Sequence, residues 1–158
     1  MNLKSQHILL LFLFPALVIL QACAISVDDS ASLQRIESIG KSPNDRRDYR
    51  ALNLENGLKV ILISDPETDK AAASMDINAG SNSDPAEFEG LAHFLEHMLF
   101  LGTQKFPQSG EYQEFISGNG GSHNAYTSYE NTNYYFDIEK DSLAPALDRF
   151  SQFFIAPL

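Results

Sequence analysis

One turn of a predicted helix carries three polar side chains inside an otherwise apolar segment. His93, Glu96 and His97 stand at positions i, i+3 and i+4, and residues at that spacing are neighbours on one helical face. A helix whose polar face adjoins an apolar one must lie at the border of a core, where it packs on one side and lines an opening on the other. The apolar face comprises Phe88, Leu91, Leu95, Met98 and Leu99.

Signals on either side of this segment predict where the helix begins and ends. Asp84 is a favourable N-cap, Pro85 suits the first helical position, and Glu87 completes a pattern like a capping box. Gly102 is expected to end the helix. The polar turn therefore lies in the middle of a helix of several turns.

Strand and helix patterns alternate along the remainder of the chain. Asn56-Gly57 is a typical hairpin turn between two apolar runs. The order of the elements indicates an α+β layered fold rather than a doubly wound parallel sheet. The expected elements are a hairpin of residues 49–54 and 58–64, a strand at 71–79, a helix at 110–117, a second hairpin of 122–127 and 132–138, and a helix that begins after Asp141 or Ser142 and carries Leu143, Leu147, Phe150 and Phe154.

Composition limits the classes of function. The chain has 158 residues, of which 44% are hydrophobic, and a formal net charge of -10. These values are typical of a globular protein. The negative charge argues against a nucleic-acid partner, because so acidic a chain offers little basic surface to displace phosphate counterions.

The first residues have the composition of a signal peptide. Lys4 precedes an apolar run from Ile8 to Leu20, which is short for a transmembrane helix and suits the core of an export signal. We therefore interpret residues 1–22 as a signal peptide and the polar residues 23–48 as a linker to the folded part. The alternative for part of this linker is a short helix around Ile36.

The single cysteine leaves two alternatives for processing. Leu20-Gln21-Ala22-Cys23 resembles a bacterial lipobox, which would make Cys23 the lipidated first residue of the mature protein. Ala22-Cys23-Ala24 also fits the small-x-small rule for ordinary signal cleavage. We favour the lipoprotein, because cysteine occurs once and only at this place. This predicts an extracytoplasmic protein of the bacterial periplasm, held at the outer membrane by a lipid anchor on Cys23.

The polar turn of the predicted helix has the side chains of a metal centre. Two imidazoles four residues apart can bind one cation, and Glu96 beside them can reach a water that the cation holds. The order histidine-x-x-glutamate-histidine is that of the inverted zinc peptidases. The alternatives are a solvated helix face and two histidines that hydrogen-bond to each other. Met98 is interpreted as core packing rather than a ligand, because zinc prefers nitrogen, thiolate and carboxylate donors.

From about Tyr49 to Leu158 the chain resembles the pitrilysin/insulin-degrading-enzyme (insulinase, M16) family of zinc metallopeptidases. The resemblance depends on many short segments that occur in the family's order. They are Leu54-Glu55-Asn56-Gly57-Leu58, Asp65-Pro66, Asp69-Lys70-Ala71-Ala72-Ala73, Gly80-Ser81, Gly90-Leu91-Ala92-His93-Phe94-Leu95-Glu96-His97-Met98, Gly102-Thr103, Gly120-Gly121, Asn124-Ala125-Tyr126-Thr127, Thr132-Asn133-Tyr134-Tyr135-Phe136 and Leu147-Asp148-Arg149-Phe150.

The resemblance implies a fold and a chemistry. The fold is an α+β, insulinase-like (LuxS/processing-peptidase-like) metallohydrolase half-domain, an antiparallel-rich sheet with helices packed on it. Residues 49–158 would be an incomplete N-terminal peptidase domain. By this resemblance His93 and His97 bind one Zn²⁺, and Glu96 is the catalytic base that accepts a proton from a metal-bound water during peptide hydrolysis.

The resemblance also implies where a peptide substrate binds. Family members add the substrate as a strand at a sheet edge near the metal, and main-chain pairing of that kind makes little demand on sequence. The matching residues are Asn124, Ala125 and Tyr126, followed by Thr127. The alternative is that these are ordinary hairpin residues. His123 has no counterpart among the family's ligands and is expected to be a loop or surface histidine.

Two features depart from the family pattern. The third zinc ligand of the family is a glutamate that lies farther beyond the second histidine than this chain extends. The domain is therefore interpreted as truncated at its C-terminus, and the chain is expected to lack the elements that would cover Phe150, Phe153 and Phe154. Four other glutamates follow the second histidine but do not match the position of the ligand, namely Glu111, Glu114, Glu130 and Glu139.

Three functions stay open at this point. The first is a zinc metalloendopeptidase that cleaves peptides or small proteins. The second is a catalytically inactive, truncated family fragment that acts as a binding protein. The third is a structural subunit, which is disfavoured because such family members often lose the five-residue motif that is intact here. A separate chain that supplies the missing part of the domain is a further expected partner.

Overall fold

The computed structural model describes residues 34–36 and 39–158. The predicted signal peptide and Cys23 lie outside these residues. The described part divides into two compact units, one with residues 34–36, 39–40 and 50–62 and one with residues 41–49 and 63–158. Within it, no helix combines the length and the hydrophobicity needed to cross a membrane.

The first unit is built on a three-stranded sheet in the order β1-β2-β3. β2 (Asp48–Asn53) and β3 (Lys59–Ser64) form the predicted hairpin. Gly57 has a positive φ of 83° at its turn, a conformation that glycine adopts without a steric penalty. β1 (Gln34–Ile36) pairs antiparallel with β2. This short strand falls inside residues 23–48, where we expected a linker or a helix, because pairing with β2 satisfies its backbone groups.

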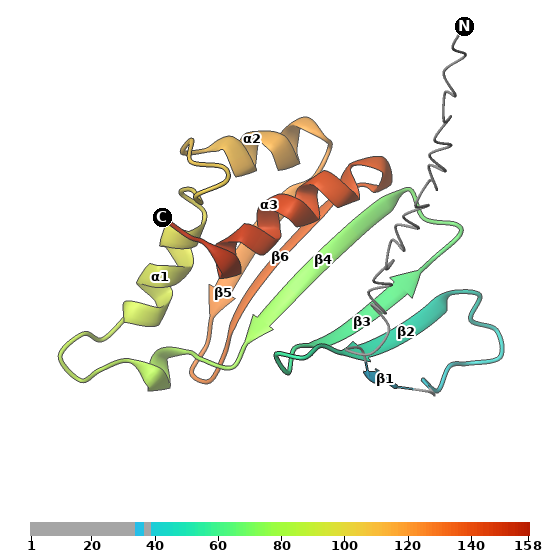
Figure 1. Ribbon diagram of the computed structural model, residues 1–158, viewed down its shortest axis with the longest axis horizontal. Coiled ribbons are helices and arrows are strands. Elements are labelled where there is room, and N and C mark those ends of the chain that lie inside the picture. The colour runs from blue at the N-terminus through green and yellow to red at the C-terminus, as the bar shows by residue number, and fades with distance from the viewer. Residues whose placement is uncertain (1–33, 37–38) are drawn as a thin grey trace, which may run out of the picture. The chain divides into compact units, whose positions relative to one another are not determined.

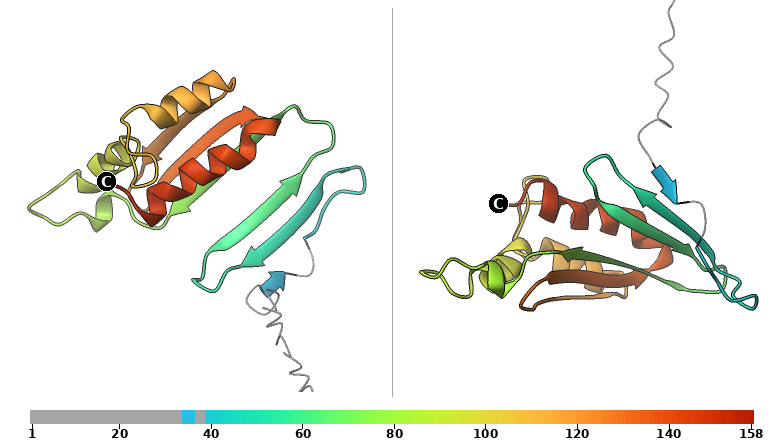
Figure 2. Two further views of the ribbon diagram at one scale, coloured as in Figure 1. Left: turned by 45° about the horizontal axis from the view of Figure 1, so that its top comes forward. Right: turned by 90° about the horizontal axis from the view of Figure 1, so that it is seen from below.

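The second unit contains an antiparallel sheet in the order β4-β6-β5. Its strands are β4 (Lys70–Ile77), β5 (Ser122–Thr127) and β6 (Thr132–Glu139). Two helices, α2 (Glu111–Gly118) and α3 (Leu143–Ile155), cover one face of this sheet, as Figures 1 and 2 show. These strands and helices confirm the predicted α+β layers. Two short 3-10 turns, η1 (Ser81–Ser83) and η2 (Lys140–Ser142), complete the unit.

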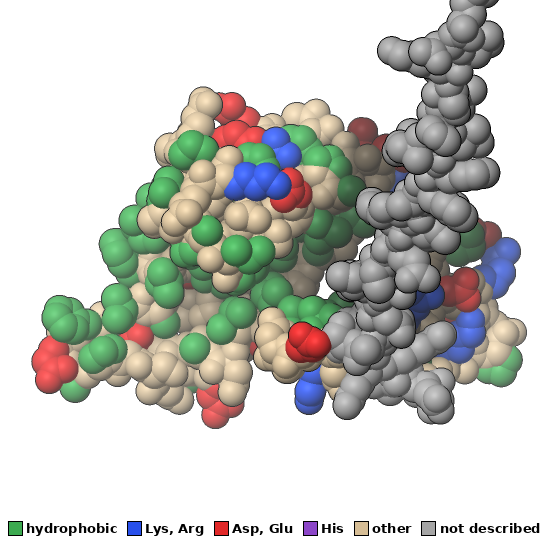
Figure 3. Space-filling model, in the orientation of Figure 1, with side chains coloured by type: hydrophobic (Ala, Val, Ile, Leu, Met, Phe, Trp, Pro, Cys, Tyr) green, Lys and Arg blue, Asp and Glu red, His purple; other side chains and the backbone are tan. Residues whose placement is uncertain are grey.

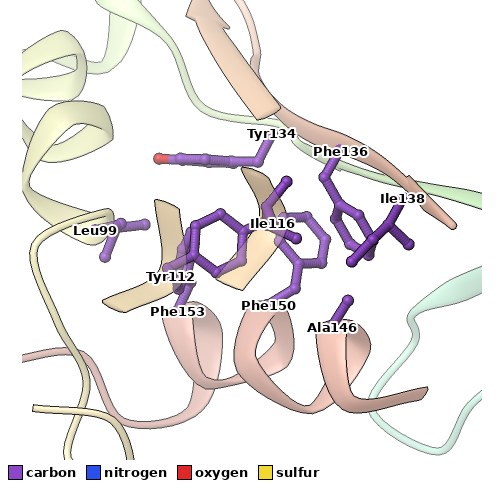
Figure 4. Packing of buried hydrophobic residues seen from close by; sticks show 9 residues of the cluster. All are labelled: Leu99, Tyr112, Ile116, Tyr134, Phe136, Ile138, Ala146, Phe150 and Phe153. Carbon is purple, nitrogen blue, oxygen red and sulfur yellow. The ribbon is translucent and has the colours of Figure 1, made fainter. Parts of the chain in front are cut away.

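The core of the second unit lies between β6 and the two covering helices. Tyr134, Phe136 and Ile138 alternate along β6 and face α2 and α3 (Figure 4). Phe150 and Phe153 of α3 are only 5% and 3% exposed. The expectation of missing cover is wrong for these two, because Phe150 packs 5.2 Å from the Phe136 ring of β6 and Phe153 packs 4.8 Å from the Tyr112 ring of α2. Phe154 is only partly buried. The cluster comprises Leu99, Tyr112, Ile116, Tyr134, Phe136, Ile138, Ala146, Phe150 and Phe153.

The helix with the polar turn is shorter than its signals predicted. α1 spans Leu91–Leu99, and residues 85–90 form turns instead of helix. Asp84 nevertheless contacts the start of α1, because its carboxylate accepts hydrogen bonds from the backbone N–H groups of Gly90 at 2.7 Å and Ala92 at 2.8 Å. Gly90, with a φ of 89°, brings the chain back toward Asp84. The N-cap is therefore Gly90 rather than the predicted Asp84, although the Asp84 carboxylate still binds N–H groups at the start of the helix.

The apolar face of α1 is largely exposed. Leu99 is buried against the sheet, whereas Met98 is 36% exposed, so the interpretation of Met98 as core is wrong. The reason is geometric, because α1 faces the sheet through the narrow stripe of Glu96 and Leu99. The space-filling view shows hydrophobic side chains gathered around α1 and the loop before it (Figure 3). The exposed residues of this segment are Phe88, Leu91, Phe94, Leu95 and Met98.

Candidate metal centre

The structure brings the two imidazoles of α1 together. The Nε2 atoms of His93 and His97 lie 3.1 Å apart, and their ring centroids are separated by 4.7 Å. Both side chains are exposed to solvent. This closeness follows from the helix, since positions i and i+4 lie one above the other on its surface. The imidazoles therefore present two adjacent nitrogens to an open space.

Glu96 adds a carboxylate from the buried side of the same turn. Its residue is only 5% exposed, yet one of its oxygens and the two ring nitrogens all lie within 4.8 Å of one another. The hydroxyl of Thr127, at the end of β5, donates a hydrogen bond to Glu96 Oε2 at 2.6 Å. A buried carboxylate needs such a partner, because its desolvation is otherwise costly.

The donor set fits a zinc ion. Two nitrogens that bind one tetrahedral zinc at about 2.0–2.1 Å are separated by about 3.3 Å, which is close to the 3.1 Å found between the Nε2 atoms. The same separation allows a hydrogen bond between the two rings when one of them is protonated at Nε2. Solvent access on the imidazole side leaves room for further ligands. The three predicted side chains thus lie close enough together to share one cation.

The glutamates of the following segment do not join this cluster. Glu111 pairs with Arg149 at 2.7 Å, and that guanidinium also lies 3.8 Å from the centroid of the Phe115 ring. Within residues 34–36 and 39–158, the group of metal-ligating side chains that the structure assembles is His93, Glu96 and His97. Glu111 is therefore occupied in joining α2 to α3.

The predicted substrate segment lies on β5, next to the centre. In the described part of the sheet, β5 is an edge strand that pairs with β6 alone. Asn124 and Tyr126 point to the exposed face, whereas Ala125 packs against the core. The strand ends at Thr127, whose side chain contacts Glu96. The edge and the candidate metal centre are thus joined by one residue.

His123 lies on β5, not in a loop or on the surface as expected. Its ring lies 5.1 Å from that of Phe100 and 5.2 Å from that of Tyr112. Burial among these rings lowers the pKa of His123, because an apolar environment disfavours the charged imidazole. Its Nδ1 atom is buried and has no hydrogen-bond partner. The inward face of the strand accounts for this position, since His123, Ala125 and Thr127 share it.

Sequence reasoning missed Tyr134 as a neighbour of the centre. Burial and the charge of Glu96 raise the pKa of Tyr134 to about 12. Figure 4 shows its hydroxyl pointing toward α1. Tyr134 also lines an apolar hollow of about 330 Å³ beside α1. No local sequence signal predicts that Tyr134 lies near α1, because β6 and α1 are far apart in the sequence. The hollow is lined by Ile77, Ala79, Ala92, Leu95, Leu99, Thr132, Tyr134 and Phe154.

A helix-covered antiparallel sheet with a histidine–glutamate–histidine turn beside its edge strand defines the insulinase-like metallopeptidase class. The profile of the family Insulinase (Peptidase family M16) matches residues 59–158. The chain belongs to this family. The sequence resemblance named above is therefore confirmed.

Relatives and solved structures agree with this membership. The insulin-degrading enzyme of Mus musculus is 57% identical over 134 residues, which are 84% of this chain and 13% of that protein. Insulin-degrading enzyme-like 2 of Arabidopsis thaliana is 53% identical over 135 residues, 85% of this chain and 14% of that protein. The crystal structure of pitrilysin superposes with a TM-score of 0.77 and 41% identity, over 80% of this chain and 14% of that one. This chain thus spans about a seventh of the length of these relatives.

A protease of Helicobacter pylori shows the same fold at greater distance. Its structure gives a TM-score of 0.64 and 26% identity over 70% of this chain and 26% of that one. A relative in Schizosaccharomyces pombe carries a name that predicts a zinc protease. It is 55% identical over 117 residues, which are 73% of this chain and 12% of that protein. These findings support metallopeptidase function at the level of the family.

Proposed function

We propose that this chain carries the zinc-binding and proton-transferring turn of a metalloendopeptidase. His93 and His97 hold the zinc ion, and Glu96 is the general base. The observation that carries this proposal is the turn itself, in which two exposed imidazole nitrogens lie 3.1 Å apart beside a buried carboxylate. A catalytic zinc site takes three protein ligands, so we propose that a residue of a further segment or of a second chain supplies the third.

The proposed role of each side chain in peptide hydrolysis follows from its position. A bound zinc ion supplies Lewis acidity, which polarises a peptide carbonyl and makes a neighbouring water a stronger acid. Glu96 takes a proton from the attacking water on one carboxylate oxygen and gives it to the leaving amine. Thr127 occupies the other oxygen, Oε2. The imidazoles stay neutral, because a protonated ring nitrogen cannot act as a ligand.

We propose that the peptide substrate binds as an added strand along β5. Its edge presents backbone groups that no other described strand uses, and main-chain pairing gives affinity without requiring a particular sequence. Asn124 and Tyr126 would contact side chains of the substrate on the exposed face. Because β5 ends at the hydrogen bond to Glu96, a strand paired with it runs toward the candidate metal centre.

Peptide cleavage by the purified chain with zinc tests the activity. We expect Glu96→Gln to lower turnover about 100- to 10,000-fold and to bind zinc as the wild type does, because both imidazoles remain. Glu114→Gln removes one carboxylate on the exposed side of α2 and should leave cleavage unchanged. Cleavage by Glu96→Gln at the wild-type rate would refute the role of Glu96. Zinc binding by a wild-type chain that cleaves nothing would favour the inactive binding fragment.

We also propose export and lipid anchoring through Cys23. The apolar run and the lipobox-like sequence before Cys23 support this proposal. In a Gram-negative host fed labelled palmitate, the wild-type chain should become labelled and sediment with outer membranes. Cys23→Ala should do neither. Equal labelling of both chains would contradict the anchor, and a soluble, unlabelled wild type in the periplasm would favour ordinary signal cleavage.

A further inference from the structure

The carboxylate of Glu96 is fixed from outside its own helix. Thr127, the last residue of β5, donates to Glu96 Oε2 at 2.6 Å. Among the residues that the structure describes, no other side chain hydrogen-bonds this carboxylate. The two residues are 31 positions apart in the chain, so the bond joins a helix to a strand.

The direction of this hydrogen bond follows from the neighbouring hydroxyl. Thr132 is paired with Thr127 across the hairpin and donates to the carbonyl of Ala79 at 2.9 Å. The two threonine hydroxyls are 3.4 Å apart, which is long for a bond between hydroxyls. The proton of Thr127 is therefore directed to the carboxylate, where a charge-assisted bond is shorter and stronger.

The backbone of Thr127 is itself held rigidly. The tight turn after β5 is closed by a hydrogen bond from Ser128 N–H to the Asn131 carbonyl at 2.8 Å, and Ser81 N–H donates to the Ser128 carbonyl at 2.9 Å. Gly80 allows the two loops to approach, because a Cβ at that position would overlap the backbone of Ser128. The backbone next to Thr127 is thus held by contacts outside α1.

We propose that Thr127 is a positioning residue that holds Glu96 in one conformation, with Oε2 engaged and the other oxygen left to carry the proton. A glutamate side chain has several rotatable bonds and loses considerable entropy when it is fixed. The bond from Thr127 selects the conformation before substrate arrives, which is how second contacts orient the reacting groups of a site. This inference rests on the proposed role of Glu96.

The conformation of Glu96 in the metal-free chain gives the first test. Side-chain scalar couplings of Glu96 are measured by NMR in wild type, Thr127→Val, Thr127→Ser and Thr132→Val. Wild type and Thr127→Ser should show a single rotamer, and Thr127→Val should show averaged couplings, because valine keeps the shape but loses the donor. Thr132→Val makes the same change at the residue paired with Thr127 across the hairpin, which does not contact the carboxylate, and should leave the rotamer intact. A single, unchanged rotamer in Thr127→Val would overturn the proposal.

Kinetics of the zinc-loaded chain give the second test. Thr127→Val should lower kcat about 10- to 100-fold with little change in KM, and Thr127→Ser should recover most of the loss. An unchanged kcat, or an effect confined to KM, would overturn the positioning role. If the wild-type chain cleaves no peptide even when a segment or chain that supplies the third ligand is added, the proposed function fails, whereas the NMR comparison still decides whether Thr127 holds Glu96.

Discussion

Within a single turn of α1, one side chain is buried and its two neighbours on the same face are exposed. Glu96 is 5% exposed, whereas His93 and His97 on either side of it are open to solvent. A carboxylate at a buried helix position costs stability compared with leucine, even when it is hydrogen-bonded. A charged group kept there is better explained by chemistry than by packing. The sequence alone predicted the three residues, because helical spacing fixes their common face. It did not predict Thr127, which hydrogen-bonds Glu96 from a distant part of the chain, or Tyr134, whose pKa the charge of Glu96 raises.

The unpartnered imidazole of His123 should make stability depend on pH. Its pKa is lowered by burial, so the unfolded chain binds a proton at a higher pH than the folded chain does. Below the ordinary pKa of about 6.5, protonation therefore favours unfolding, and the free energy of unfolding falls as the pH decreases. Urea denaturation at pH 7 and at pH 5 should show a smaller loss for His123→Phe than for wild type. Equal losses would contradict this role.

At the scale of elements, local signals placed most strands and helices correctly. Local backbone preferences are enough to predict the Asn56-Gly57 turn and the turn at the glycines after α2. The predicted hairpins appear at β2-β3 and β5-β6. The start of α1 escaped prediction for a physical reason. The Asp84 carboxylate binds the N–H group of Gly90, six positions later in the chain and separated from it by turns. The spacing rules for a local N-cap do not include this geometry.

The cap on α1 can be tested by removing its carboxylate. Asp84→Ala should lower the free energy of unfolding by about 1 kcal/mol, the usual effect of losing an N-cap, because two backbone N–H groups lose their acceptor. Glu87→Ala, an exposed position in the same loop, should have little effect. Chemical denaturation of both variants measures the difference. Equal stabilities of the two variants would show that the distant cap does not stabilise α1.

At the scale of the molecule, this chain contains two units, of which the second carries the candidate metal centre. Its core was only partly predictable. Phe150 and Phe153 of α3 are buried, contrary to expectation, while most apolar residues of α1 are exposed. Hydrophobic periodicity predicts which residues share a helix face, but not which face another element covers. The same limit applies to the site, since the imidazole pair follows from one helix and its surroundings follow from the tertiary fold.

Zinc-dependent stabilisation tests most directly whether this turn holds a metal ion. A ligand that binds only the folded chain adds about 2.7 kcal/mol at 100 times its dissociation constant. Zinc should therefore raise the thermal unfolding midpoint of wild type, Glu96→Gln and the control His123→Phe, and a chelator should reverse the increase. The double variant His93→Ala/His97→Ala should show no increase. An equal rise in the double variant would contradict the assignment of the metal to these two histidines.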